Sequence, residues 1–190
     1  MSKAHDQLSP ANKTHYNEMC SYLFSILTAL RPFMLLAGLQ LISGIIFLTA
    51  GTVDISTVAI PRILIADLII AALFALPPFI QHRRTLYKLA QNGLLDSASA
   101  DFAISEAHLK NRFRLGSRFM FIKGSGRAID LHDARGCEFQ HRRIGGSFRW
   151  WLLLYMLDGR TLWVFECRKE FHDELGHILR PAIKRATSAR

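Results

Sequence analysis

The sequence predicts a membrane α-helical hairpin followed by a small α+β domain, in which an antiparallel sheet is closed by a carboxy-terminal helix. Two apolar stretches of 18 residues each, 33–50 and 63–80, predict the hairpin. At about 1.5 Å per helical residue, each would span roughly 27 Å, close to the hydrocarbon thickness of a bilayer. Beyond residue 102, short alternating runs and then one run with helical spacing predict the domain.

Residues 1–31 are expected to form a polar amino terminus followed by an amphipathic juxtamembrane helix. Apolar residues between Met19 and Leu30 recur three and four positions apart, while Ser21, Ser25 and Thr28 lie off that stripe. Two interpretations of this helix stay open. It lies in the membrane interface, or it lengthens the first membrane span.

Basic residues beside the two apolar stretches predict their orientation. Lys13 and Arg31 flank the first stretch, and the connecting segment 51–62 carries only Arg62 against Asp54. Three more basic residues follow the second stretch: Arg83, Arg84 and Lys88. Because Lys and Arg accumulate in cytoplasmic loops, we expect a two-pass protein of a bacterial inner membrane with both termini in the cytoplasm.

Two polar residues of the hairpin, residues 32–81, are candidate intramembrane sites. Gln40 lies near the middle of the first stretch, and Asp67 lies about one turn into the second. A carboxylate at that depth costs about 1–3 kcal/mol unless it pairs or reaches the interface. We expect Asp67 to stabilise helix packing or a homo-oligomer formed through the membrane helices, with a proton or ion path as the alternative. Pro77 and Pro78 predict a bend where the second helix leaves the membrane.

Residues 82–101 are expected to form a juxtamembrane helix that ends near Asn92 and Gly93, followed by a linker at 96–101. In the domain, residues 102–190, the segment 105–112 has a partly helical pattern. Four short strands are then expected, at 112–115, 118–123, 127–131 and 137–143, with turns at 124–126 and 145–146.

The strongest strand signal is a pair of apolar runs within residues 148–167, joined by Asp158-Gly159. This dipeptide favours a two-residue hairpin turn. The resulting cross-strand pairs include Leu152 with Phe165 and Leu154 with Trp163. Because both faces of this hairpin are apolar, we expect it in the middle of the core. The last predicted element is an amphipathic helix at 169–184, broken at Pro181.

Several motifs of the domain occur together in the order of a known family. They are Arg118-Phe119-Met120-Phe121-Ile122, then Ala128-Ile129-Asp130-Leu131-His132-Asp133-Ala134, then the Leu157-Asp158-Gly159-Arg160 turn and the closing helix. In these features, residues 102–184 resemble the pleckstrin-homology-like (PH-like) domains that bacteria attach to two-span anchors. The resemblance implies seven strands, whereas the sequence shows five or six, and it transfers no catalytic residues.

Charge is the clearest indication of a partner. After Gln81 the chain carries 20 Lys and Arg against 11 Asp and Glu, an excess equal to the net charge of +9 of the whole chain. A basic domain held near a membrane meets anionic lipid, and each basic residue contributes about 1 kcal/mol. The residues expected to bind the membrane surface are Arg83, Arg84, Lys88, Arg112, Arg114, Arg118, Arg142 and Arg143.

No motif predicts a reaction, a metal or a cofactor. His172 and His177 are five residues apart rather than four, so they do not share a helical face as zinc-protease ligands do. The three cysteines, Cys20, Cys137 and Cys167, have no paired spacing. We therefore expect no enzyme, and neither a catalytic nor a cofactor nor a metal site.

The sequence thus favours a membrane-anchored binding or scaffolding protein. Its basic domain is expected to lie against anionic lipid or to dock a protein partner, and nucleic acid is not an expected partner. Two alternatives remain: a membrane immunity protein against a toxin, and an accessory subunit of a transport or enzyme complex.

Overall fold

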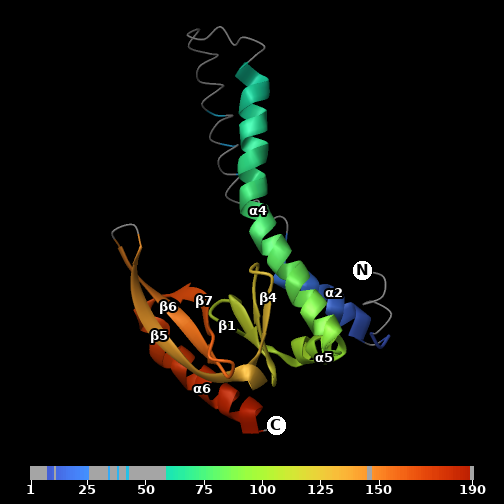
Figure 1. Ribbon diagram of the computed structural model, residues 1–190, viewed down its shortest axis with the longest axis vertical. Helices are drawn as coiled ribbons and strands as arrows, with labels where there is room; N and C mark the ends of the chain where they lie inside the picture. The colour runs from blue at the N-terminus through green and yellow to red at the C-terminus, as the bar shows by residue number, and fades with distance from the viewer. Residues whose placement is uncertain are drawn as a thin grey trace. The chain divides into compact units, whose positions relative to one another are not determined.

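The computed structural model describes residues 8–10, 12–25, 34, 38, 42, 59–144 and 147–188. The chain divides into two compact units. Figure 1 shows the helices and strands in chain order by colour. The first unit comprises Met1–Asp96 together with the short segment Ile122–Arg127, and the second comprises Ser97–Phe121 and Ala128–Arg190.

The first unit is built on helices α2 (Asn12–Leu23) and α4 (Ala59–Gln91). The Phe24 ring, just past the end of α2, lies 5.6 Å from Phe79 and 5.7 Å from His82 on α4. The carbonyls of Tyr22 and Leu23 accept hydrogen bonds from the turn at 122–127, whose donors are the amides of Gly124 and Gly126. These bonds satisfy carbonyls that the end of a helix otherwise leaves without a partner.

Within the part of the chain that the structure describes, no helix combines the length and the apolar character needed to cross a bilayer. This finding corrects the predicted membrane hairpin and, with it, the predicted two-pass inner-membrane localisation. The second predicted span lies in α4, which continues through Pro77 and Pro78 without ending and runs on into the predicted juxtamembrane helix. The first span and Gln40 lie outside the described residues, apart from residues 34, 38 and 42.

The carboxy-terminal part of α4 is an amphipathic segment whose buried side packs within the first unit. His82, Thr85, Leu86 and Leu89 are all less than 9% exposed. Long helices with one buried face are held by such packing rather than by a uniformly apolar surface. The sequence prediction separated this segment from α4 because its composition changes at residue 81, whereas the helix itself continues.

The second unit begins within helix α5 (Leu95–Ile104), so the predicted linker at 96–101 is helical. Its first sheet has the strand order β1-β2-β3-β4 and its second β5-β6-β7. The first four strands are β1 (Glu106–His108), β2 (Phe113–Leu115), β3 (Phe119–Ile122) and β4 (Arg127–Asp130). The others are β5 (Ala134–Ile144), β6 (Ser147–Met156) and β7 (Thr161–Cys167). Two antiparallel sheets therefore replace the one that was predicted.

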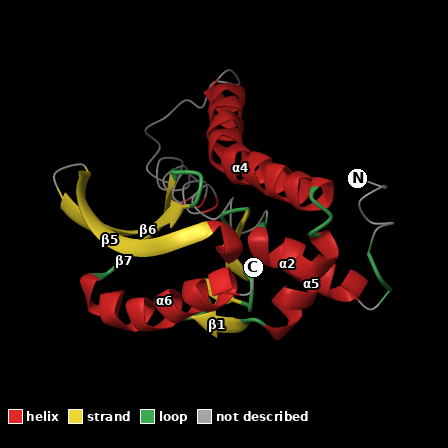
Figure 2. Ribbon diagram, turned by 60° about the horizontal axis from the view of Figure 1, so that its bottom comes forward, coloured by secondary structure: helices red, strands yellow, loops and turns green. Residues whose placement is uncertain are grey.

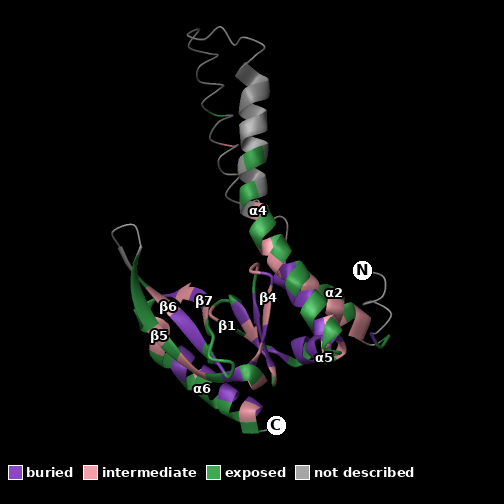
Figure 3. Ribbon diagram, viewed as in Figure 1, coloured by how far each residue is buried: buried purple, intermediate pink, exposed green. Residues whose placement is uncertain are grey.

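The short helix η1 (Leu131–Asp133) links the two sheets, and η2 (Lys169–Phe171) leads into α6 (His172–Ser188). Helix α6 lies along β5 (Figure 2) and passes through Pro181 without breaking. The stacked rings of Phe113 and Phe165, 5.6 Å apart, join the two sheets. Other core residues of this unit are Phe119, Phe121, Leu131, Leu152, Leu154, Leu175 and Leu179. Figure 3 shows buried residues, in purple, on strands such as β6 and on α6.

The β6–β7 hairpin confirms one predicted pair and corrects another. Leu152 pairs with Phe165 as expected, but an irregularity after Leu152 shifts the register, so that Leu154 pairs with Leu162 rather than Trp163. The turn is also longer than two residues, because the Met156 amide donates to the Arg160 carbonyl and Gly159 adopts a φ of +81°. Glycine takes this left-handed conformation without steric cost.

The segment 105–112 contains a strand rather than a helix. β1 pairs with β2 over only three residues, and the connecting turn holds Leu109, Lys110 and Asn111 at positive φ. The turn predicted at 124–126 is confirmed between β3 and β4. The turn predicted at 145–146 lies outside the described residues.

Candidate functional site

The eight basic residues expected to bind a surface divide between the two units. Arg83, Arg84 and Lys88 lie on α4 and are exposed. The other five lie on the second unit. The two groups therefore belong to separate units of the chain.

Two of the five arginines on the second unit, Arg112 and Arg114, lie over aromatic rings of that unit. Arg112 lies over the Phe165 ring at 5.6 Å. Arg114 lies over Phe102 at 4.6 Å and donates to the Ser105 carbonyl at 2.8 Å. Such cation–π contacts and hydrogen bonds fix the side chains against the domain. These two arginines therefore stabilise the fold, in addition to whatever charge they present.

Arg118 forms a partly buried ion pair in the second unit. Its Nε and Nη2 atoms donate to the Asp130 carboxylate at 2.6–3.1 Å. This hydrogen bonding raises the pKa of Arg118. Asp130 also accepts from the His132 amide at 3.0 Å and so caps η1. The pair thus fixes the loop before β3 to the start of η1.

Arg142 and Arg143 are exposed neighbours on β5. The Arg142 guanidinium lies 5.5 Å from the centre of the Trp163 ring. Because successive strand residues point to opposite faces, the side chains of the two arginines lie on opposite faces of the sheet.

The clearest unpartnered surface of the described chain lies on α4. Ile69, Leu73, Leu76 and Ile80 are 40–68% exposed. At about 100° per helical residue they fall within a sector roughly 60° wide. We call these four residues the apolar stripe. Exposed apolar residues in one contiguous row are unusual on a protein surface and mark interaction sites.

The same face of α4 continues into basic and aromatic residues. Tyr87, which is 68% exposed, follows the apolar stripe in helical register. Arg83 and Arg84 flank Tyr87 on that face, and Lys88 lies at its edge. The stripe and these four residues form what we call the docking face. The sequence prediction assigned its apolar part to a membrane span and its basic part to a flank, and so missed that they share one side of one helix.

The opposite side of α4 holds the helix in place. His82, at about 180° from the docking face, stacks on Phe24, and burial lowers the pKa of its imidazole. A Cβ added at Gly126, where φ is +70°, would lie 2.5 Å from the His82 amide nitrogen and 2.6 Å from the Pro78 carbonyl oxygen. This close packing determines which side of α4 stays exposed.

The remaining predicted site residue, Asp67, lies within α4, and its side chain is not among those described. In the described part of the chain, no group of three or more His, Cys, Asp or Glu could hold a metal ion. Burial raises the pKa of the thiols of Cys20 and Cys167 to about 11. A thiol with so high a pKa is a poor nucleophile.

Comparison of the chain with protein-family models, with curated proteins and with solved structures finds no match. The resemblance to PH-like domains therefore gains no support from relatives.

Proposed function

We propose that the protein is a binding module that attaches to an anionic lipid surface through the docking face of α4. The observation that carries this proposal is the position of the apolar stripe, in line with Tyr87 and the basic residues on one exposed side of the helix. In this proposal the helix lies on the lipid, and no catalytic step is involved.

Each part of the docking face suits a different depth of a lipid surface. Large apolar side chains in the stripe would enter the boundary between head groups and acyl chains, where burial of a Leu or Ile contributes about 1.5–3 kcal/mol. Tyr87 suits the interface, because its ring is apolar and its hydroxyl is polar. Arg84 and Lys88 would meet lipid phosphates, each contributing about 1 kcal/mol.

The alternative occupant is a partner helix, including α4 of a second copy. A partner helix would also bury the apolar stripe, but it would need carboxylates opposite Arg83, Arg84 and Lys88. The docking face carries no Asp or Glu among its described residues, so two parallel copies would place like charges together. Anionic lipid supplies negative charge to Arg84 and Lys88 directly, which favours the lipid surface.

The test is flotation of the purified full chain with vesicles of phosphatidylcholine, with and without phosphatidylglycerol. We expect flotation with the anionic vesicles, weakened by salt because the basic residues contribute through screened charge. Arg84→Gln with Lys88→Gln should lower the partition coefficient roughly 30-fold, from two contributions of about 1 kcal/mol each. The matched control, Arg168→Gln with Lys169→Gln, removes two exposed charges from the second unit and should bind as the wild type does.

A second pair of variants tests the apolar part. Leu73→Glu places a carboxylate in the apolar stripe and should abolish flotation, whereas Leu157→Glu alters an exposed leucine elsewhere and should have no effect. The proposal is wrong if the protein fails to float at low salt. It is also wrong if Leu73→Glu floats normally, or if sedimentation shows a dimer that Leu73→Glu dissociates while flotation is unchanged.

A further inference from the structure

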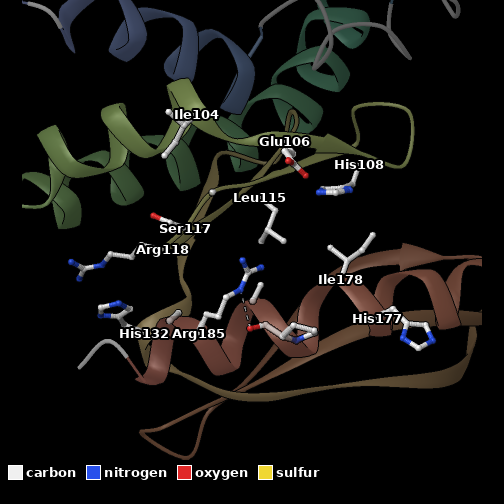
Figure 4. Close-up of a pocket in the computed structure, with 14 residues that line it drawn as sticks. Ile104, Glu106, His108, Leu115, Ser117, Arg118, His132, His177, Ile178 and Arg185 are labelled. Carbon is white, nitrogen blue, oxygen red and sulfur yellow. Dashed lines mark hydrogen bonds between the residues drawn. The ribbon is translucent and has the colours of Figure 1, made fainter.

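The second unit contains a cleft of about 780 Å³ between the first sheet and α6 (Figure 4). One wall consists of Glu106 and His108 on β1 and Leu115 on β2. Glu106 and Leu115 are cross-strand partners and therefore lie on the same face of the sheet. From the opposite wall, Ile178 and Arg185 extend from α6 toward these strands (Figure 4). The volume lies within the range of about 300–1,000 Å³ typical of small-molecule sites.

The end of the cleft is shaped by a rigid loop. Asp101, which is 5% exposed, accepts hydrogen bonds from the amides of Ser117, Arg118 and Phe119 at 2.7–3.1 Å and from the Ser117 hydroxyl at 2.6 Å. Gly116 lies directly against this carboxylate, where any Cβ would collide with it. The cleft is thus bounded by fixed backbone, which favours a preformed site.

The chemistry of the walls is asymmetric. Leu115, Ile178 and Ala182 provide an apolar floor, and Ile104, which is 72% exposed, provides an apolar lip. Glu106 is the only carboxylate among the residues that line the cleft. The other ionisable lining groups are Arg118, Arg185, His108, His132 and His177.

Arg185 is the cation of the cleft that no carboxylate neutralises. Arg118 is paired with Asp130 outside the lining, whereas Arg185 has no ion pair within the described chain and donates only a long hydrogen bond of 3.4 Å to the Pro181 carbonyl. Its guanidinium points between the two walls (Figure 4). An unneutralised guanidinium above an apolar floor is suited to one anionic group attached to an apolar body.

We propose that this cleft binds a small amphipathic anion, a carboxylate or phosphate monoester with a short apolar chain. Its anionic head pairs with Arg185, and its chain lies against Leu115 and Ile178. The planar guanidinium can donate two parallel hydrogen bonds to either head group. All the lining residues belong to the second unit, so this site does not depend on the docking face of α4.

The test is isothermal titration calorimetry of the full chain with decanoate, decyl phosphate, decanol and decyltrimethylammonium, each below its micelle concentration. Decanoate and decyl phosphate should bind with saturation at one site, and the comparison between them identifies the preferred head group. Arg185→Gln should weaken that binding about 10- to 100-fold, the range for loss of a charged hydrogen-bond donor. Lys184→Gln, on the same helix but outside the cleft, should leave it unchanged.

Three further variants test whether the anion binds in the cleft rather than on the docking face. Ile178→Trp fills the cleft from a half-exposed position and should abolish binding of the anion. If the tryptophan lowers the melting temperature, Ile104→Glu replaces it, because a carboxylate at the lip of the cleft should also abolish anion binding. Leu73→Glu, which disrupts the docking face, should not alter the calorimetric titration. The proposal is overturned if neither anion binds, if decanol binds as tightly as decanoate, or if Arg185→Gln and Lys184→Gln behave alike.

Discussion

Replacement of Asp101 by asparagine should destabilise the second unit by about 3–5 kcal/mol. The carboxylate accepts four hydrogen bonds: the Ser117 amide and hydroxyl donate to Oδ1, and the amides of Arg118 and Phe119 donate to Oδ2. An asparagine keeps one acceptor oxygen. Its NH₂ group must then face two of the four donors, and all four belong to residues 117–119, which cannot move away without opening the core.

The magnitude follows from those two lost bonds. A hydrogen bond to a charged acceptor is worth about 1.5–3 kcal/mol, and the Phe119 amide belongs to a fully buried residue, so water does not replace its partner. Loss of two such bonds removes a large part of a typical total stability of about 5–15 kcal/mol. The Ser117 donors are exposed and can be rehydrated if they are the ones left unpaired, which places the loss at the lower end of the range.

Tryptophan fluorescence during urea unfolding measures this effect. All three tryptophans, Trp150, Trp151 and Trp163, lie in the second unit, so the signal reports on that unit alone. Glu106→Gln makes the same acid-to-amide change at an exposed position of the same unit and should shift stability by less than about 0.5 kcal/mol. If Asp101→Asn also changes the unfolding free energy by less than about 0.5 kcal/mol, the four hydrogen bonds do not hold the loop, and the reasoning is refuted.

Three other outcomes are expected. Gly126→Ala should destabilise the first unit by at least about 2 kcal/mol, because its Cβ would lie 2.5 Å from a backbone atom of α4 at a φ of +70°. Chemical unfolding followed by circular dichroism measures this, and an unchanged midpoint would contradict it. Burial lowers the pKa of His82 in the folded state, so the unfolded chain binds more protons near about pH 6.5 and stability falls as the pH falls through that value. His82→Phe should reduce this loss of unfolding free energy between about pH 7.5 and about pH 5. An unchanged dependence of the unfolding free energy on pH would exclude His82 as its source. Lys110→Gly should stabilise the β1–β2 turn by up to about 1 kcal/mol, because Lys110 is exposed at a φ of +56°, and a lowered melting temperature would show that the left-handed turn is not strained.

Local signals in the sequence located several strands and turns of the second unit. Gly124 and Gly126 marked the β3–β4 turn, and the pairing of Leu152 with Phe165 followed from apolar runs around Gly159. The same reasoning missed β1, because a three-residue strand before a left-handed turn has too little periodicity to recognise. It also placed the β6–β7 register one residue off beyond Leu152, since an irregularity inside a strand leaves no mark in an apolar run.

For the candidate sites too, some features follow from local sequence and others depend on tertiary contacts. The basic character of the chain after residue 81 and the helical spacing of the stripe on α4 can be read directly from the residues. That Arg112 and Arg114 lie over aromatic rings, while Arg185 points into a cleft without forming an ion pair among the described residues, depends on contacts between distant segments. Composition counts these three arginines equally, whereas packing gives them different roles.

The sequence by itself determined the helical character of α4 and α6, the extended character of β2 to β7, and which of their residues are apolar. These follow from it because 3.6-residue and two-residue periodicities are local properties of the chain. Only the tertiary structure decided which side of α4 is covered, how the strands divide into two sheets, and where a cleft stays open. The physical reason is that burial depends on what packs against a residue. The contacts of His82 with Phe24, and of Asp101 with the loop before β3, join positions 58 and 16 to 18 residues apart in the chain.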